Sequence, residues 1–167
     1  MNKTAVKEIE ESALVEIYLN SPLDEPRGFC LDIKGYKFSA NVERGLQAHT
    51  CYSYQGEIAV DQGFDFAQLA NQEFYLPNFD ICMHAEKDQE TAELVLRACD
   101  KSALQQFILG DDGKIYLKAD TNLCVTVSED NSREGGGGTP VHLIRNISMQ
   151  KCSDNLSLYQ IWTARSN

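Results

Sequence analysis

The sequence contains no long hydrophobic run and little positive charge. Its 167 residues include 15 Lys and Arg against 25 Asp and Glu, which gives a formal net charge of −10. A chain this acidic lacks the basic surface that attracts nucleic acids and anionic membranes, and no apolar run approaches the roughly 18 residues that span a bilayer. We therefore expect no nucleic-acid partner and no membrane insertion. The first residues, Met1–Glu10, also lack the apolar segment of a signal peptide, although a processed chain would look the same.

The motifs of common catalytic and metal sites are missing as well. The sequence has no Cys-x-x-Cys pair, no nucleophile elbow and no metal-ligand spacing. A run of four glycines, Gly135–Gly138, is not followed by Lys-Ser or Lys-Thr, so it is no phosphate-binding loop. We therefore expect no enzyme and no cofactor.

What the sequence does contain is typical of one globular domain. Apolar residues make up 43% and charged residues 24% of the chain. Residues 1–27 are charged and include the Pro-rich stretch Ser21–Pro26, which predicts an N-terminal arm that leads into the first strand. Part of this arm, Ala5–Leu19, could form a short helix. Residues 28–167 then form a single domain.

Six cysteines fall into three consecutive doublets, whose members lie 21, 17 and 28 positions apart. They are Cys30, Cys51, Cys82, Cys99, Cys124 and Cys152. Six thiols allow 15 pairings, and spacing alone does not choose among them. Disulfide bonds need an oxidising compartment, so we expect a secreted or periplasmic protein. The alternative is a cytosolic protein with six buried, reduced thiols.

Each doublet belongs to an internal repeat. The first cysteine of a doublet lies in a short apolar alternation that is typical of a strand. These segments are Phe29–Ile33, Ile81–Ala85 and Leu123–Val127. A polar turn follows each of them, and then a second strand. We place the second strands at Gly45–Cys51, Glu93–Cys99 and Pro140–Arg145, with extra residues near Ile147–Lys151 that delay the last cysteine.

A Gln-x-aromatic motif closes each repeat. The three motifs are Gln62–Phe64, Gln105–Phe107 and Gln160–Trp162. The repeats therefore cover residues 28–73, 74–116 and 117–167, nearly all strand and loop, with the three closing aromatics in the core. One helical turn is expected within Asp61–Leu76, before Pro77. Three such repeats fit a small closed barrel better than a propeller.

The order Cys-Leu-Asp, Leu-Gln-x-x-x-Cys, Gln-x-aromatic is complete in the first repeat and echoed in the other two. It resembles the ricin B-type lectins, also described as family 13 carbohydrate-binding modules, over about Gly28–Ala164. The resemblance implies an all-β fold, the β-trefoil, with three pseudo-repeats and about twelve strands. It implies one disulfide within each repeat, namely Cys30–Cys51, Cys82–Cys99 and Cys124–Cys152. It also implies that the ligands are glycans of the galactose or N-acetylgalactosamine type.

Only the first repeat keeps all the sugar-binding residues that the resemblance implies. This first-repeat set is Asp32, Gln47, His49, Asp61 and Gln62. A carboxylate accepts hydrogen bonds from paired sugar hydroxyls, and an amide both donates and accepts. An aromatic ring covers the apolar face of the sugar, and either His49 or a ring from a neighbouring loop takes this role. The neighbouring rings are Tyr36, Phe38, Tyr52 and Tyr54.

The second and third repeats lack the carboxylate. We expect the equivalent residues to be His84, Val95 and Arg97 in the second repeat and Thr126, His142 and Ile144 in the third. The sequence thus predicts one competent site, with weak and monovalent binding. We expect avidity to come from an oligomer or from attachment to another module.

Each candidate also has a structural interpretation. Asp32 can hold a turn, because Lys34 and Gly35 follow it, and His49 can be a surface strand residue. The closing glutamines recur where the rest of the site is lost, which indicates that they bind backbone groups. Asp32 and Asp61 could form a catalytic carboxylate pair for glycoside hydrolysis, but an open, shallow pocket rarely excludes water. The alternative function is a trefoil that has lost sugar binding and acts through protein contacts, as an inhibitor or adaptor.

Overall fold

The computed structural model describes residue 9 and residues 13–166, and each repeat in it contributes four strands. The first repeat contains β1 (Leu14–Leu19), β2 (Phe29–Ile33), β3 (Leu46–Thr50) and β4 (Phe64–Asp65). The second contains β5 (Tyr75–Leu76), β6 (Ile81–Ala85), β7 (Leu94–Arg97) and β8 (Phe107–Leu109). The third contains β9 (Ile115–Leu117), β10 (Asp120–Val127), β13 (Ile147–Lys151) and β14 (Trp162–Arg165). Three four-stranded repeats make the predicted β-trefoil.

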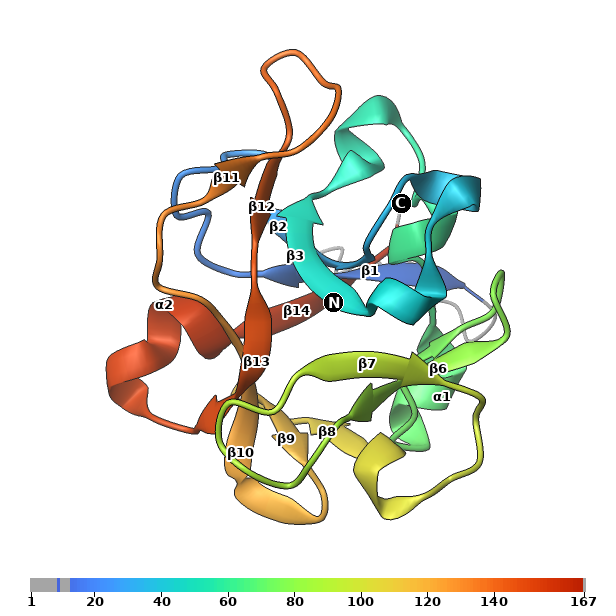
Figure 1. Ribbon diagram of the computed structural model, residues 1–167, viewed down its shortest axis with the longest axis vertical. Helices are drawn as coiled ribbons and strands as arrows, with labels where there is room; N and C mark the ends of the chain where they lie inside the picture. Colours follow the sequence, from blue (N-terminus) through green and yellow to red (C-terminus); the bar gives the residue numbers. More distant parts are fainter. Residues whose placement is uncertain (1–8, 10–12, 167) are drawn as a thin grey trace, which may run out of the picture.

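The strand pairing follows the repeats. In each repeat the second and third strands form an antiparallel hairpin, β2 with β3, β6 with β7 and β10 with β13. The outer strands join neighbouring repeats, since β1 pairs with β14 and β8 pairs with β9. In Figure 1, β3, β7 and β13 surround the middle of the view, and these three strands contact one another pairwise.

The three closing aromatics lie in the core, as predicted. Phe64 and Phe107 are fully buried, and Phe74 contacts both edge-on, with ring centroids 6.0 and 5.9 Å apart. The Trp162 ring is also buried, and its Nε1 donates a hydrogen bond to Val125 O at 3.1 Å. The one polar atom of this indole is therefore satisfied inside the core.

Each repeat carries its own disulfide, which confirms the predicted pairs Cys30–Cys51, Cys82–Cys99 and Cys124–Cys152. The closing glutamine of each repeat bridges the two residues that flank the second cysteine. Its Oε1 accepts from the backbone N–H after that cysteine at 3.0 Å in all three repeats. Its Nε2 donates to the carbonyl before that cysteine, at 3.0, 2.8 and 2.9 Å. We call this arrangement the glutamine clamp. It confirms the predicted backbone role of Gln62, Gln105 and Gln160.

One strand assignment in the third repeat is wrong. The partner of β10 is β13 and not Pro140–Arg145, so Thr126 lies opposite Ser148 and Cys124 opposite Gln150. The segment before β13 instead contains an extra hairpin, β11 (Arg133–Glu134) and β12 (Leu143–Arg145). β12 pairs with β3 of the first repeat, which extends that repeat's sheet (Figure 1). We call this element the covering hairpin.

Helical structure in the described residues is limited to α1 (Phe66–Ala70), α2 (Ser157–Gln160) and short 3-10 turns. α1 is the turn predicted before Pro77, and the Asp65 side chain caps it by accepting from two backbone N–H groups. The helix expected over Ala5–Leu19 is wrong at its C-terminal end, where β1 is a strand that pairs with β2, β4 and β14. Of its remainder, only Ile9 and Ala13 are among the described residues. No helix in the described residues is long and apolar enough to cross a membrane.

Candidate functional site

The acid and the two amides of the first-repeat set lie together. Asp32 on β2 is directly opposite Gln47 on β3, and Gln47 Nε2 donates to Asp32 Oδ2 at 2.9 Å. Gln62 is the last residue of the 3-10 turn Val60–Gln62, and its Nε2 donates to Asp32 Oδ1 at 3.2 Å. Both carboxyl oxygens are thus paired with amides, and Asp32 is 0% exposed. As folded, no atom of Asp32 is open to a ligand.

Asp61 is the second carboxyl group of this cluster and is equally buried. Its Oδ2 accepts a hydrogen bond from the backbone N–H of Lys37 at 2.8 Å. Burial and the nearby Asp61 raise the pKa of Asp32 well above its ordinary value, and burial also raises the pKa of Asp61. Two buried carboxyl groups this close resist ionising together. The pair therefore holds a proton at pH values where exposed carboxyl groups are ionised.

His49 is buried rather than open to a sugar. Its Nδ1 lies 2.7 Å from Thr50 O, and its ring stacks on Tyr52 with centroids 5.0 Å apart. The His142 ring contacts the His49 ring edge to face, with ring centroids 5.2 Å apart. Burial lowers the pKa of His49 from 6.5 to about 4, so the ring is neutral at pH 7 and donates from Nδ1 to the carbonyl.

The covering hairpin brings His142 to this cluster and is held there by several polar contacts. Leu143 N–H donates to Thr50 Oγ1 at 2.8 Å, next to the β12–β3 pairing. Arg27 donates to two carbonyls of the same segment, at 2.8 and 3.1 Å. The Tyr54 hydroxyl lies 2.6 Å from His142 Nε2. The sequence assigned His142 to the third repeat's own pocket. The signal for its true place was the 28-position spacing of the third doublet, which leaves room for an inserted element.

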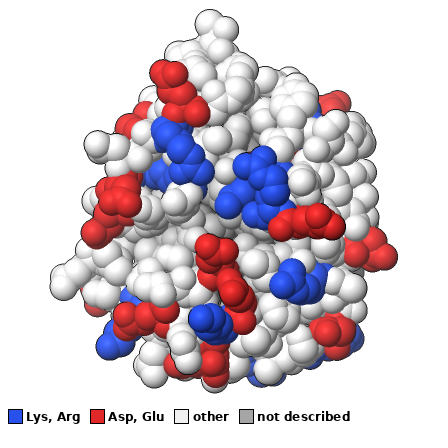
Figure 2. Space-filling view, viewed as in Figure 1, with Lys and Arg blue, Asp and Glu red and all other residues white. Residues whose placement is uncertain are grey.

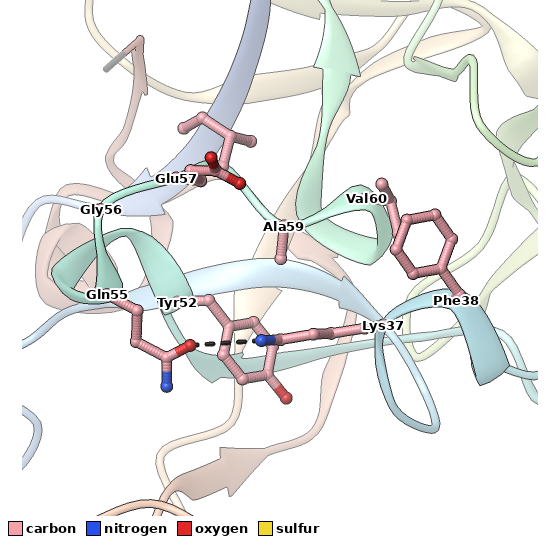
Figure 3. A pocket seen from close by; sticks show the side chains of 9 residues that line it. Lys37, Phe38, Tyr52, Gln55, Gly56, Glu57, Ala59 and Val60 are labelled. Carbon is pink, nitrogen blue, oxygen red and sulfur yellow. Dashed lines mark hydrogen bonds between the residues drawn. The ribbon is translucent and has the colours of Figure 1, made fainter.

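A pocket of about 510 Å³ lies beside the cluster, and the Tyr52 ring is the wall that both share. We call it the Tyr52 pocket. Lys37 extends over the Tyr52 ring, with its Nζ 5.1 Å from the ring centroid and 3.2 Å from Gln55 Oε1. Figure 3 shows Glu57 across the pocket from Lys37, and Phe38 at one side. The pocket therefore combines an aromatic face, an ammonium group, an amide and a carboxylate.

The Tyr52 pocket is built by the expanded part of the first repeat. Asp61 lies ten positions after Cys51, and residues 52–60 form most of the pocket wall. Tyr36, Phe38 and Tyr52 all lie around this loop, as the sequence suggested for a replacement platform, and Phe38 is 76% exposed. The sequence did not single out Lys37, Gln55 or Glu57, because nothing in a loop of polar residues distinguishes pocket walls from ordinary surface.

The other two repeats have different residues at the same register positions. In the second repeat they are His84, Val95 and Arg97, as predicted. In the third repeat they are Thr126, Ser148 and Gln150, which replaces the expected His142 and Ile144. These three line an open groove of about 300 Å³.

Groups of side chains close enough to hold a metal ion occur twice in the described residues. Each group consists of one glutamate and two cysteines, Glu16 with Cys30 and Cys51, and Glu73 with Cys82 and Cys99. All four cysteines are disulfide-bonded, so they offer no thiolate to a metal. Neither group is a metal site as folded.

The class of protein follows from the fold, a β-trefoil whose first repeat carries a buried acid and amide cluster beside a polar, aromatic pocket. A family model, the ricin-type beta-trefoil lectin domain, matches residues 23–162, and the chain belongs to this family. No curated protein sequence matches the chain.

Several solved structures share the fold at low sequence identity. The C-half of an earthworm R-type lectin, in complex with GalNAc, is 19% identical with a TM-score of 0.61, over 93% of this chain and 99% of that one. The mdaA-1 domain is 14% identical with a TM-score of 0.68, over 99% and 98%. The β-trefoil lectin of the Vibrio vulnificus hemolysin/cytolysin, with bound N-acetyl-D-lactosamine, is 16% identical with a TM-score of 0.54, over 93% and 95%.

Proposed function

We propose that this protein binds carbohydrate at a single site in its first repeat, with glycans of the galactose or N-acetylgalactosamine type as ligands. The observation that carries the proposal is the Tyr52 pocket, which adjoins the repeat that keeps the full acid and amide set. Membership of the lectin-domain family supports it. So does the earthworm lectin of the same fold, which was solved with GalNAc.

The chemistry of the Tyr52 pocket suits a sugar. The exposed Phe38 ring at the edge of the pocket offers an apolar face to the C–H groups of a pyranose. Glu57 can accept from two neighbouring hydroxyls, while Gln55 and Lys37 can donate to ring and hydroxyl oxygens. These groups surround a volume of about 510 Å³, which exceeds the size of one monosaccharide.

In this proposal, the first-repeat set holds the residues that touch the sugar. Gln62 Oε1 accepts from the Tyr52 N–H at 3.0 Å, and His49 stacks on the Tyr52 ring. Asp61 accepts from the Lys37 N–H at 2.8 Å. Asp32 and Gln47 complete the network behind them. Direct contact between Asp32 and a sugar is a second mode of the same proposal, and it requires the Tyr52 ring to move aside.

The test is a titration of galactose and N-acetylgalactosamine into isotope-labelled protein, followed by amide chemical shifts. We expect saturable shifts around Lys37, Tyr52 and Glu57, with affinity on the order of millimolar for one monovalent site. Glu57→Gln removes the carboxylate and should weaken binding about tenfold. Glu86→Gln removes an equal charge from an exposed position outside this pocket and is the matched control.

The variants also separate the two modes. If Glu57→Gln has no effect but Asp32→Asn abolishes the shifts, the sugar reaches Asp32 itself. If neither sugar nor a broad glycan panel causes saturable shifts, carbohydrate binding at the first repeat is wrong.

A second candidate function is protein binding, as an inhibitor or adaptor. Exposed aromatic side chains favour it, because Tyr36 is 58% and Phe38 76% exposed next to the Tyr52 pocket. A silent glycan panel together with loss of partner binding on Phe38→Ser would favour this function. The matched control is Leu158→Ser, which changes an exposed apolar residue on α2.

We propose further that the protein is secreted or periplasmic and acts without catalysis. Three disulfides support the oxidising compartment. The burial of both Asp32 and Asp61 argues against a catalytic pair, because neither carboxyl can meet a glycosidic bond as folded. One weak site also favours an oligomer or a tethered arrangement.

A further inference from the structure

A second pocket, of about 350 Å³, lies where the three hairpins of the trefoil meet. We call it the axial pocket. Its floor is apolar and comes from equivalent positions of the three repeats, the first residues of β3, β7 and β13. These are Leu46, Leu94 and Ile147, all buried. Gly45 permits this close approach, since its φ is +80° and a Cβ there would lie 3.0 Å from Leu94 O.

The rim of the axial pocket is rich in hydrogen-bond donors. Lys34 and Arg44 line it, and within residues 13–166 neither side chain has a hydrogen bond or an ion pair. Several other basic residues are engaged, such as Arg27 with Glu25 and Arg165 with Glu16. Two unpaired cations around one concavity are notable in a chain with a net charge of −10.

Neutral donors complete the rim. Asn146 uses its Oδ1 to accept from Arg133, which leaves its NH₂ group as a donor. Ser148 Oγ accepts from Gln150 Nε2, so its hydroxyl hydrogen remains available. Glu93 is the one acidic side chain in the lining. Figure 2 shows basic and acidic side chains next to one another around the middle of this face.

We propose that the axial pocket binds a small oxyanion, the sulfate, phosphate or carboxylate group of an acidic ligand. Arg44 and Lys34 supply charge-assisted hydrogen bonds, and the hydroxyl and amide donors complete the coordination of the oxygens. Glu93 disfavours ions of higher charge density and sets the affinity low. The lining shares no residue with the Tyr52 pocket, so this site does not depend on the proposed sugar site.

The experiment follows amide shifts of labelled protein during titration with sodium sulfate, sodium phosphate or sodium glucuronate. Sodium chloride at matched ionic strength and neutral glucose are the ligand controls. We expect saturable shifts at Gly45, Leu46, Leu94 and Ser148 with the oxyanions only, with dissociation constants on the order of millimolar. Sulfate and phosphate binding without glucuronate binding would assign the site to free tetrahedral anions. Binding of all three would extend it to the acidic groups of glycans.

The variants connect the shifts to the pocket. Arg44→Met and Lys34→Met should each weaken sulfate binding about tenfold, because each removes a charge-assisted bond. Glu93→Gln should strengthen it a few-fold. Lys118→Met and Asp111→Asn make the same charge changes at exposed positions outside the pocket and should have no effect. Equal shifts with chloride, or unchanged affinity in both cation variants, would overturn the proposal.

Discussion

The first and third repeats place different side chains on the same hairpin framework. Asp32 and Thr126 occupy the same register position, two residues after the first cysteine of each doublet. Both are buried, but a neighbouring position differs: His49 on β3 is buried, whereas Gln150 at the same position of β13 is partly exposed and lines an open groove. The covering hairpin explains the difference, because it leaves from the third repeat and docks on the first. An insertion in one repeat thus changes the accessibility of another.

The largest expected change in stability concerns the glutamine clamp, because among the three clamp glutamines only Gln62 also donates to a buried carboxyl group. Gln62→Met leaves a buried N–H, a carbonyl and Asp32 Oδ1 without their amide partner and should cost about 4 kcal/mol. Gln105→Met removes only the two backbone contacts and should cost about 2 kcal/mol. Urea unfolding of both variants measures the difference. Equal losses would show that the bond to Asp32 contributes nothing.

The next test uses the pH dependence of stability. The folded pKa of His49 is about 4, below its ordinary 6.5, so the unfolded chain binds the extra proton first as pH falls. His49 therefore contributes stability that is complete above pH 6.5 and is lost as pH falls towards 4, by up to about 3 kcal/mol. His49→Gln, which copies the amide of Gln150 in the third repeat, should remove this loss. Unfolding free energies between pH 4 and pH 7 measure it, and parallel pH profiles of parent and variant would contradict it.

A smaller effect of opposite sign is expected at Asp32. Its pKa is raised in the folded protein, so below the ordinary pKa of 3.8 the unfolded and folded chains are both protonated at this residue. The contribution of Asp32 to the free energy of unfolding is complete there and declines as pH rises towards the folded pKa. Asp32→Asn stays neutral and should be more stable than the parent at pH 7, by about 1 kcal/mol. The advantage should shrink towards pH 4. The decisive quantity is the difference in unfolding free energy between parent and variant, and a variant that is less stable at pH 7 would show that Asp32 is stabilising as an anion.

The smallest effect is expected where the covering hairpin meets the first repeat. Tyr54→Phe removes the contact between the Tyr54 hydroxyl and His142 and should cost about 0.5–1 kcal/mol. The loss should appear locally, as faster hydrogen exchange at the amides of β12, while the amides of β10 are unchanged. Exchange that accelerates equally in both strands would mean that the hairpin does not open independently.

Much of the fold could be predicted from the sequence because it depends on features that repeat. Three cysteine doublets and three closing Gln-x-aromatic motifs predict three copies of one hairpin, and the structure contains them. The covering hairpin could not be placed, since its position depends on pairing between β12 and β3, which are far apart in the sequence. Its residues Leu143–Arg145 have the pattern of an ordinary strand, so the sequence predicts Pro140–Arg145 as the partner of β10, a position that β13 takes.

The candidate site was predictable in its composition but not in its exposure. The register places Asp32 opposite Gln47, as two consecutive strands of a hairpin require. The burial of His49 next to them depends on Tyr52 and His142, one from an expanded loop and one from another repeat. Neither ring is assigned to this place by any local pattern. Burial of a polar cluster is decided by long-range packing, whereas hydrophobic periodicity and motif spacing are local features of a sequence.

The glutamine clamp separates the architecture of a repeat from its ligand chemistry. All three repeats keep the same pair of backbone contacts around the second cysteine, yet only the first has an acid two residues after its first cysteine. A duplicated repeat of this kind can therefore change every residue that faces a ligand and still close correctly. Gene duplication within such a fold supplies copies that are free to diverge, as the third repeat does where its inserted hairpin covers the first.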